Sequence, residues 1–356
     1  MPYCRRCGAK LDEDAHFCHK CGTPVATYSY ASPARSAPLK PIRNDPVVIG
    51  AIVLVSILIV GVVVAAFFAA PFSIINIDQT YQDNTTDVSK LNLNFETEAA
   101  QVNVFTQDVN DNNFVIGIQG SASKGMFGGN SDSPVQFTLY NDTVNGVQMV
   151  TVKLEESTAF SRYKVICNIY LNPALTLNLN ITSQAGQVSI ISDKPATFES
   201  INLQASAGSV GANLQNATIV GNVALKTQAG TVDFRTSEML VEGNSTFDLH
   251  SNAGSVNMDI TQTKTLQGNL QINATTELGS INVGLFIDGD VGAKITSQTN
   301  LGSIHTNLQY FSGNQSPIQS DNYPATSNIE MNVRTNLGSI NINAAYQSTF
   351  NPILSN

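Results

Sequence analysis

The six residues TNLGSI occupy positions 299–304 and recur unchanged at 335–340. A close copy, TELGSI, stands at 276–281, and four looser copies upstream end in Ala-Gly-x-Val. The glycines of these seven copies are Gly186, Gly208, Gly230, Gly254, Gly279, Gly302 and Gly338, at intervals of 22, 22, 24, 25, 23 and 36 residues. A nearly fixed period of this length is typical of proteins built from stacked structural repeats.

Four positions around each glycine keep one chemical character through the copies. The second residue after the glycine is always β-branched, and the residue directly after it is always polar. The residue before it is Ala or Leu, and the seventh residue before it is apolar. The β-branched column is Val188, Val210, Val232, Val256, Ile281, Ile304 and Ile340. This alternation predicts short β-strands with the Val/Ile column facing inward and the Ser/Thr column facing outward.

The prediction for residues 71–356 is therefore an all-β domain, a β-solenoid of stacked coils of 22–25 residues. A glycine fits each corner because a Cβ there would clash or demand the wrong φ. Identical residues recur because neighbouring coils pose the same packing problem. A leucine-rich repeat would need a Leu-rich pattern and a helical return segment, which the sequence lacks. A β-sandwich stays open for the less regular part.

The two ends of the repeat region are less regular. Residues 93–104 form an eighth copy, with Leu93 and Val102 in the apolar columns and Ala100 in place of glycine. Between this copy and Gly186 we expect a β-rich insertion at about 105–175, with a hairpin turn at Asn145-Gly146. The long last interval predicts a surface loop at 310–327.

The first 23 residues contain two Cys-x-x-Cys pairs, Cys4/Cys7 and Cys18/Cys21, each followed by a glycine. Two such pairs can complete the tetrahedral four-cysteine site that Zn²⁺ prefers. The sequence thus predicts a small zinc ribbon at 1–23 in which these four cysteines hold one Zn²⁺. Metal binding would supply the folding energy, since so short a piece cannot build a core. His16 and His19 are expected to be solvated loop residues.

This stretch resembles the short N-terminal zinc ribbons of many prokaryotic membrane proteins, through the four cysteines together with Gly8 and Gly22. The resemblance implies a structural zinc site. With all four ligands supplied by protein, no position is left for a catalytic water.

A membrane anchor is expected after the ribbon. Residues 24–46 are rich in proline and read as a linker, and residues 47–70 are 24 residues without a charge. Such a run is long enough for one transmembrane helix. Arg35, Lys40 and Arg43 precede it, whereas the first basic residue after it is Lys90. The positive-inside rule therefore predicts a single-pass protein of the plasma membrane, with a cytoplasmic N-terminus and an extracellular C-terminal domain.

Charge argues against nucleic acid as a partner. The chain has a formal net charge of −9, and residues 47–356 hold 23 Asp and Glu against 11 Lys and Arg. In the ribbon, Asp12, Glu13 and Asp14 nearly balance four basic residues. A phosphate backbone would be repelled by the acidic part of the chain.

The repeat region resembles the putative-adhesin family of β-solenoid domains, found on surface proteins of bacteria and archaea. The Ala-Gly-Ser-Val and Leu-Gly-Ser-Ile corners carry this resemblance over about residues 90–345. It implies a β-solenoid and a place at the cell surface, and the whole chain resembles an archaeal type. The family defines no binding residues that could be transferred to this sequence.

The sequence offers no catalytic motif. It lacks the nucleophile elbow, the zinc-protease motif and the phosphate-binding loop. Glu155 and Glu156 are neighbours on a predicted strand and so point to opposite faces. His250 and His305 lie at ordinary repeat positions, and Cys167 lies in an apolar strand. We therefore expect a non-enzymatic protein.

Two hypotheses for function remain. In the first, the solenoid is a binding or envelope-structural module at the surface, and its ligand is an external protein or glycan. In the second, the chain is a transmembrane sensor whose zinc ribbon contacts a cytoplasmic protein partner. A proline-rich tether and one helix transmit force poorly, so the sequence favours the first.

Overall fold

The structure of this protein is a computed structural model that describes residues 3–4, 6–11, 16–22, 74–124, 134–156, 160–313 and 316–347. The chain divides into two compact units, Met1–Ala70 and Pro71–Asn356. The predicted linker at 24–46 and the predicted membrane helix at 47–70 lie outside the described residues. In the ranges that are described, no helix has the length and hydrophobicity to cross a bilayer.

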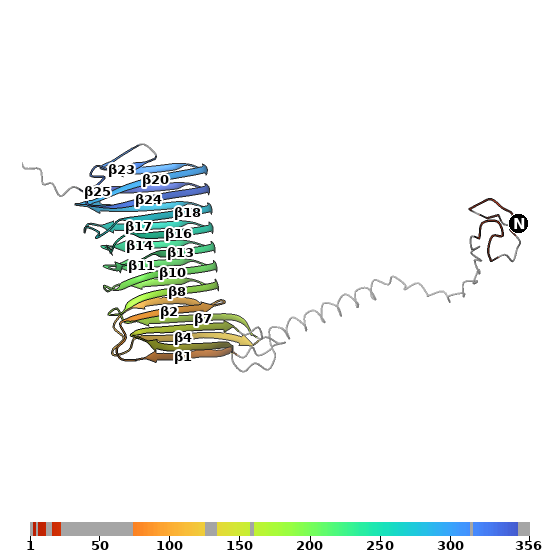
Figure 1. Ribbon diagram of the computed structural model, residues 1–356, viewed down its shortest axis with the longest axis horizontal. Helices are drawn as coiled ribbons and strands as arrows, with labels where there is room; N and C mark the ends of the chain where they lie inside the picture. Colours follow the sequence, from red (N-terminus) through yellow and green to blue (C-terminus); the bar gives the residue numbers. More distant parts are fainter. Residues whose placement is uncertain are drawn as a thin grey trace, which may run out of the picture. The chain divides into compact units, whose positions relative to one another are not determined.

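The second unit is all-β and consists of two sheets, which confirms the all-β part of the prediction (Figure 1). The 11-stranded sheet contains, in spatial order, β1 (Ile74–Asp83), β4 (Phe114–Lys124), β7 (Phe160–Leu171), β3 (Gln101–Thr106), β9 (Val188–Ser192), β11 (Val210–Gln215), β14 (Val232–Ser237), β17 (Val256–Gln262), β19 (Ile281–Asp288), β25 (Ile340–Gln347) and β21 (Ile304–Gln309).

The 14-stranded sheet contains, in spatial order, β22 (Phe311–Ser312), β23 (Ile318–Ser320), β20 (Val291–Leu301), β24 (Ser327–Leu337), β18 (Leu270–Leu278), β16 (Ser245–Ala253), β13 (Val223–Ala229), β10 (Thr197–Ala207), β8 (Thr176–Ala185), β2 (Lys90–Thr97), β6 (Val147–Glu156) and β5 (Val135–Val144). The short strands β12 (Thr218–Ile219) and β15 (Leu240–Val241) pair with each other, and β12 also pairs with β10.

Each sequence repeat supplies one strand to each sheet. The two strands are joined at a corner that contains the recurring glycine. The repeat around Gly230, for example, runs through β13 in the 14-stranded sheet and then through β14 in the 11-stranded sheet. Equivalent strands of neighbouring repeats pair in parallel and in register, so Val232 lies between Val210 and Val256. The predicted columns are therefore rows of residues that face one another across neighbouring strands.

The core lies between the two sheets. The whole Val/Ile column is buried except Ile304, which is partly exposed on the terminal strand β21. Phe234 from one sheet meets Phe247 from the other edge to face, with 5.5 Å between the ring centroids. Burial alternates along the strands, because successive side chains of a strand point to opposite faces. Each repeat thus buries its apolar side chains against the repeats on both sides.

The order of the last repeats differs from simple succession along the chain. The strands of the final repeat, β24 and β25, lie between β18/β19 and β20/β21. The two TNLGSI stretches therefore face each other directly, with Thr299 opposite Thr335 and Leu301 opposite Leu337. The position next to β18 and β19 is thus occupied by β24 and β25, although β20 and β21 come earlier in the chain. Every such position offers the same packing, so the repeat pattern itself does not specify this order.

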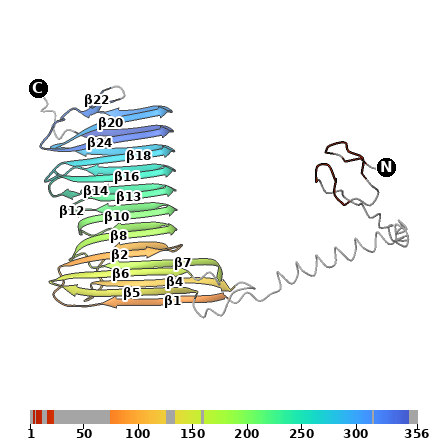
Figure 2. The ribbon, with the colours of Figure 1, turned by 45° about the vertical axis from the view of Figure 1, so that its right-hand side comes forward.

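The segment at 310–327 also differs from the predicted surface loop. It contains β22 and β23, which pair with each other, and β23 extends the 14-stranded sheet beyond β20 (Figure 2). Cis peptide bonds precede Pro317 and Pro324 in this segment. The segment covers the edge that β20 would otherwise present.

The first end of the array follows the predicted eighth repeat. Leu93 pairs with Leu179, and Val102 pairs with Val188. The residues between this repeat and Gly186 form β4–β7, which continue both sheets outward. The predicted hairpin is confirmed, since β5 and β6 are joined by Asn145 and Gly146, both with positive φ.

Candidate functional site

The four cysteines predicted to bind metal lie together in the first unit. Their sulfur atoms are all within 4.8 Å of one another. Cys4 Sγ is 3.6 Å from Cys21 Sγ, and Cys7 Sγ is 3.6 Å from Cys18 Sγ. A tetrahedral zinc site with Zn–S bonds of about 2.3 Å places its sulfurs about 3.8 Å apart. The spacing of this cluster therefore fits one tetrahedral ion.

Two equivalent turns build the cluster. Gly8 N–H donates to Cys4 C=O at 2.9 Å, and Gly22 N–H donates to Cys18 C=O at 2.8 Å. Both glycines have positive φ, +70° and +67°, as the sequence predicts for this position. Leu11 packs against Cys4 and Cys18 in a small apolar cluster. Each Cys-x-x-Cys pair is thus folded back by its own glycine.

The electrostatics of the cluster favour a cation. Backbone N–H groups of Arg6 and Cys7 hold the pKa of the Cys4 thiol below its usual value. The Ala9 N–H lowers the pKa of Cys7, but the neighbouring sulfurs and burial outweigh it and raise that pKa to about 12. Several thiolates this close repel one another unless a positive ion lies between them. A divalent metal ion bound between the sulfurs would offset this repulsion.

His16 and His19 lie outside the cluster, and both are exposed. This outcome agrees with the prediction that they are loop residues. The cluster therefore presents four sulfur ligands of one chemical type, which suits Zn²⁺ among the common metal ions.

The second candidate feature is the row of corner glycines in the repeat array. A Cβ on Gly254 would lie 1.9 Å from Gly230 O, and one on Gly230 would lie 2.1 Å from Gly208 O. The φ values of Gly208, Gly230 and Gly254 lie between +139° and +151°. Both the backbone conformation and the close approach therefore require glycine.

Sequence reasoning missed a column of hydroxyl residues three positions before every corner glycine except Gly208, where Ala205 stands. Thr227 Oγ1 donates to Gly208 C=O at 2.8 Å, and Ser251 Oγ donates to Gly230 C=O at 2.9 Å. Thr276, Thr335 and Thr299 make the equivalent bonds in later repeats. These hydroxyls are donors to backbone carbonyls at the corners. A search for polar as well as apolar columns would have found them.

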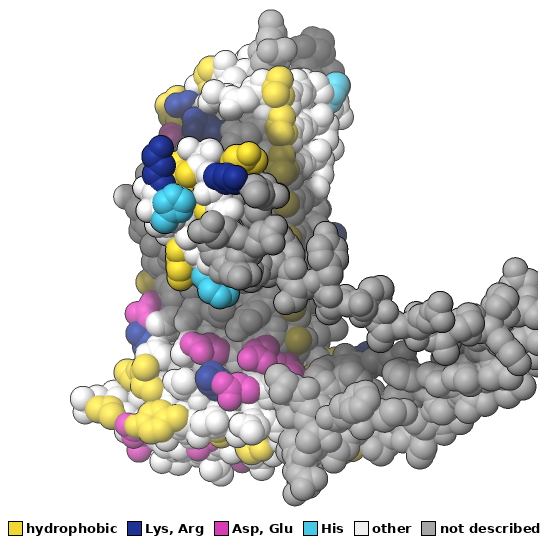
Figure 3. All heavy atoms as spheres, turned by 90° about the vertical axis from the view of Figure 1, so that its right-hand side faces the viewer, with side chains coloured by type: hydrophobic (Ala, Val, Ile, Leu, Met, Phe, Trp, Pro, Cys, Tyr) yellow, Lys and Arg dark blue, Asp and Glu magenta, His cyan; other side chains and the backbone are white. Residues whose placement is uncertain are grey.

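The column directly before the glycines is exposed, although its residues are apolar. In spatial order it reads Ala185, Ala207, Ala229, Ala253, Leu278, Leu337 and Leu301. The exposed fractions of Leu278, Leu337 and Leu301 are 52%, 44% and 67%. Figure 3 looks at this corner and shows hydrophobic side chains aligned along the stack. The outer surface thus has an apolar line beside polar faces.

The polar faces carry rows of side-chain amides. Asn257 Nδ2 donates to Asp233 Oδ1, Asn282 Nδ2 to Asn257 Oδ1, and Asn341 Nδ2 to Asn282 Oδ1, each at 2.8 Å. A second row links Asn332, Asn273 and Asp248. Each row runs across neighbouring repeats and ends on a carboxylate. Such ladders reinforce the register that the backbone pairing sets.

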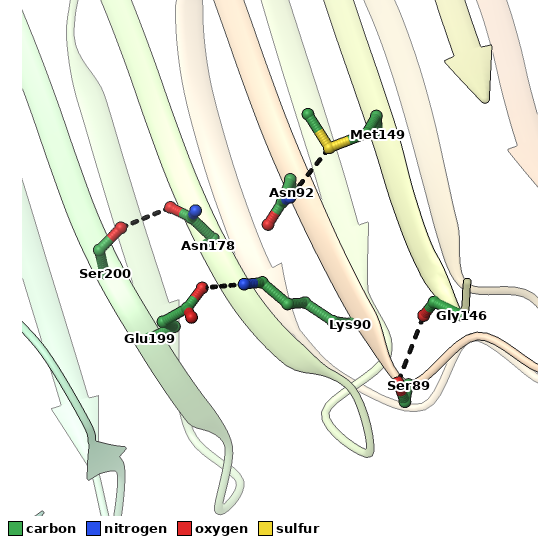
Figure 4. A network of polar contacts seen from close by, with 8 residues as sticks. All are labelled: Ser89, Lys90, Asn92, Gly146, Met149, Asn178, Glu199 and Ser200. Atoms are coloured by element: carbon green, nitrogen blue, oxygen red, sulfur yellow. Dashed lines mark hydrogen bonds and ion pairs between the residues drawn. The ribbon is translucent and has the colours of Figure 1, made fainter. Parts of the chain in front are cut away.

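Contacts at the other end of the array are more varied (Figure 4). Lys90 on β2 reaches across β8 to form an ion pair with Glu199 on β10. Asn92 Nδ2 lies 2.9 Å from Met149 Sδ, and Ser200 bonds to Asn178. These contacts join side chains on strands that are adjacent or one strand apart, and they do not converge on a common centre.

The candidate catalytic residues are not brought together. Glu155 forms an ion pair with Lys153, whereas Glu156 Oε1 accepts a bond from Ala99 N–H at 3.1 Å. Burial raises the pKa of Glu156. His250 on β16 bonds to Asn252, and His305 on β21 bonds to Ser303. The two histidines therefore lie on different strands. Cys167 is fully buried on β7, as predicted, and burial raises the pKa of its thiol.

One open depression of about 530 Å³ lies on the outer face of the 11-stranded sheet. Its lining includes Asp259, Asn282, Gly284, His305 and Asn343. The lack of a side chain at Gly284 creates the hollow between Asp259 and Asn343, which are its partners on the two sides. The lining contains no nucleophile paired with a base.

Comparisons with known proteins gave one domain-family match and several similar solved structures. Residues 3–25 match the model of the zinc-ribbon domain. No curated protein matches the chain. Among solved structures, the chain is similar to a putative cell adhesion protein from Clostridium sporogenes, with 14% identity and a TM-score of 0.37 over 76% of this chain and 100% of that one. It is also similar to a putative adhesin from Bacteroides fragilis, with 15% identity and a TM-score of 0.29 over 75% of this chain and 97% of that one.

Proposed function

We propose that this chain is a single-pass protein of the prokaryotic plasma membrane that displays a non-enzymatic binding or envelope-structural module outside the cell. Its N-terminal ribbon lies in the cytoplasm and residues 47–70 form the membrane helix. The sequence supports this anchoring through the uncharged run at 47–70 and the basic residues before it.

The outer module is a β-solenoid in this proposal. The observation that carries it is the parallel, in-register pairing of equivalent strands from one repeat to the next in both sheets. A stack of this kind is rigid and can be extended by adding repeats, and it exposes long regular faces. Those properties suit a module that holds a binding surface away from a membrane.

The ribbon is a structural zinc site held by Cys4, Cys7, Cys18 and Cys21. The sulfur spacing, the two glycine turns and the zinc-ribbon match support it. Bound zinc would fix the two cysteine turns to each other, and four protein ligands leave no position for substrate. The ribbon therefore serves folding or protein contact rather than catalysis.

The absence of a catalytic role is part of the proposal. Glu155 pairs with Lys153, His250 bonds to Asn252 and His305 bonds to Ser303, in each case a residue two positions away in the sequence. The external ligand, a protein or a glycan, would then contact the polar faces or the apolar line of the array.

Protease treatment of intact cells that carry the full-length chain tests this proposal. Added protease should degrade the region after Pro71 and leave an N-terminal fragment that contains the ribbon. A matched sample of lysed cells should lose the ribbon too. Protection of the repeat array in intact cells, together with loss of the ribbon, would contradict the proposed orientation.

A further inference from the structure

The strand β21 is an unprotected sheet edge. It is the last strand of the 11-stranded sheet, and no described strand pairs with its outer side. Its sequence, Ile-His-Thr-Asn-Leu-Gln, contains no Lys, Asp, Glu or Pro and no bulge. Sheet edges normally carry such features because a bare edge pairs with other chains.

The other edges of the array are better protected. The edge strand β1 carries Asp78 and Asp83, and the edge strand β5 carries Asp142. Beyond β20, the edge of the 14-stranded sheet is covered by the short strands β22 and β23. The terminal repeat is therefore capped in one sheet and open in the other.

The core is incomplete at this open edge. Ile304 and Leu308 pack against the core but stay partly exposed, whereas Ile340 and Ala344, their partners on β25, are buried. The difference arises because β25 has a neighbour on both sides and β21 has one. A strand added beside β21 would bury the two apolar side chains.

The backbone of β21 shows which groups are free to pair. Ser303 C=O accepts a bond from Ile340 N–H at 2.9 Å, so the backbone groups of Ser303 point towards β25. Backbone groups alternate along a strand. The N–H and C=O groups of Ile304, Thr306 and Leu308 therefore point outward, away from the sheet.

We propose that β21 pairs antiparallel with β21 of a second copy of this chain, about a two-fold axis at Thr306. Two-fold pairing must match outward-pointing residues with one another, so the axis lies on a residue rather than between two. Centres at His305 or Asn307 would set Thr306 opposite Ile304 or Leu308 of the partner subunit, which pairs a polar with an apolar residue. At Thr306, Ile304 lies opposite Leu308 of the partner subunit, and His305 lies opposite Asn307 of the partner subunit. Apolar residues then face apolar residues, and no like charges oppose each other.

The alternative centre at Leu308 fits less well. It would set Ile304 opposite Tyr310 of the partner subunit, and Tyr310 lies past the end of the strand with a φ of +56°. A head-to-tail contact between β21 and β1 would bring β21 against an edge that carries Asp78 and Asp83. The self-complementary contact at Thr306 joins two edges that carry no charged residue.

This contact has a consequence for function that rests on the proposed membrane anchoring. The array begins at β1, four residues after the predicted span, and β21 is the opposite end of the same sheet. Pairing through β21 joins two arrays end to end, with their β1 edges outermost. Two anchored copies would then link two membranes, and the partner of the outer module would be the same protein.

The test is the mass of the full-length chain, purified in detergent, as a function of concentration. The wild type should dimerise. In Thr306→Pro, the lost N–H points outward, so the ladder to β25 is kept while the central pair of the interface is broken. Loss of these backbone hydrogen bonds should raise the dissociation constant about tenfold or more. The melting temperature of the variant serves as the folding control.

A cysteine scan identifies the contact and its register. Under mild oxidation, Thr306→Cys should give a disulfide that joins two copies through position 306, detected by peptide mass spectrometry, because paired Cα atoms lie about 5.5 Å apart. Asn307→Cys should not, since its partner is position 305. A monomer at all concentrations, a dimer unaffected by Thr306→Pro, or a cross-link from 306 to another segment would each overturn the proposal. None of these results depends on membrane orientation, so they are separate from failure of the proposed anchoring.

Discussion

At the corner glycines, a single missing Cβ decides whether two repeats can stack. Gly254 has a φ of +147° and approaches Gly230 O too closely for any side chain. We predict that Gly254→Ala lowers the free energy of unfolding by about 3 kcal/mol or more. Gly211→Ala is the matched control, since a Cβ there would meet Asp233 O at 3.6 Å, an ordinary contact. Thermal unfolding measures both, and equal losses would contradict this account of the corner.

Two adjacent residues, Thr231 at the corner and Val232 at the start of β14, should lose very different amounts of stability on the same substitution. Val232 is fully buried in the Val/Ile column, whereas Thr231 is half-buried at the outer side of the corner. Val232→Asp places a carboxylate without a partner in the core and should cost several kcal/mol, about the whole stability of a modest domain. Thr231→Asp should cost about 0.5 kcal/mol. Similar melting temperatures for the two variants would mean that the register is wrong.

Residue patterns predicted which side chains face inward, because apolar burial leaves a clear periodic signal. They did not predict that Leu278, Leu301 and Leu337 are exposed. An apolar column looks the same in sequence whether it faces the core or the solvent, and only the position of the corner separates the two. The hydroxyl column that includes Thr227 was missed for a different reason. Its residues are polar and buried, and they bond to backbone rather than to one another.

At the scale of single elements, the ribbon should depend on its metal. Cys18 is almost fully buried and lies 3.6 Å from Cys7 Sγ. Metal analysis of the full-length chain should give one zinc per chain, and Cys18→Ser should abolish tight binding because one of four ligands is lost. His16→Ala is the control and should keep the metal, since His16 is exposed and outside the cluster. One tightly held equivalent in Cys18→Ser would refute the four-cysteine site.

Element prediction succeeded where local signals were strong. The Asn145-Gly146 turn and the eighth repeat at 93–104 were both predicted, because each depends on a short pattern with one structural meaning. The strands β22 and β23 were not, since two and three residues carry too little pattern to distinguish a strand from a loop.

At the scale of the whole molecule, the order of the repeats could not be predicted from the sequence. All repeats share the same columns, so the final one fits equally well at several positions in the stack. Its place between β18/β19 and β20/β21 depends on the segment at 310–326, which covers the outer edge and leads the chain back. The repetition identifies the fold, but because the repeats are alike it gives no information on the order in which they stack.

The central claim is that identical stretches recur because they pack directly on one another. Leu301 and Leu337 belong to the two TNLGSI copies, are exposed and pair across neighbouring strands. Neighbouring strands lie about 4.8 Å apart, within reach of a disulfide, whereas strands two apart are about 10 Å apart and out of reach.

The most direct measurement is therefore disulfide formation in two double variants of the full-length chain, with peptide mapping by mass spectrometry. Leu301→Cys with Leu337→Cys should form an intramolecular disulfide readily under mild oxidation. Leu278→Cys with Leu301→Cys should not, because β24 lies between their strands. No disulfide in the first variant would contradict the direct pairing of the two TNLGSI stretches. A disulfide in the second variant would place β20 beside β18, as stacking in chain order requires, and would also contradict the account.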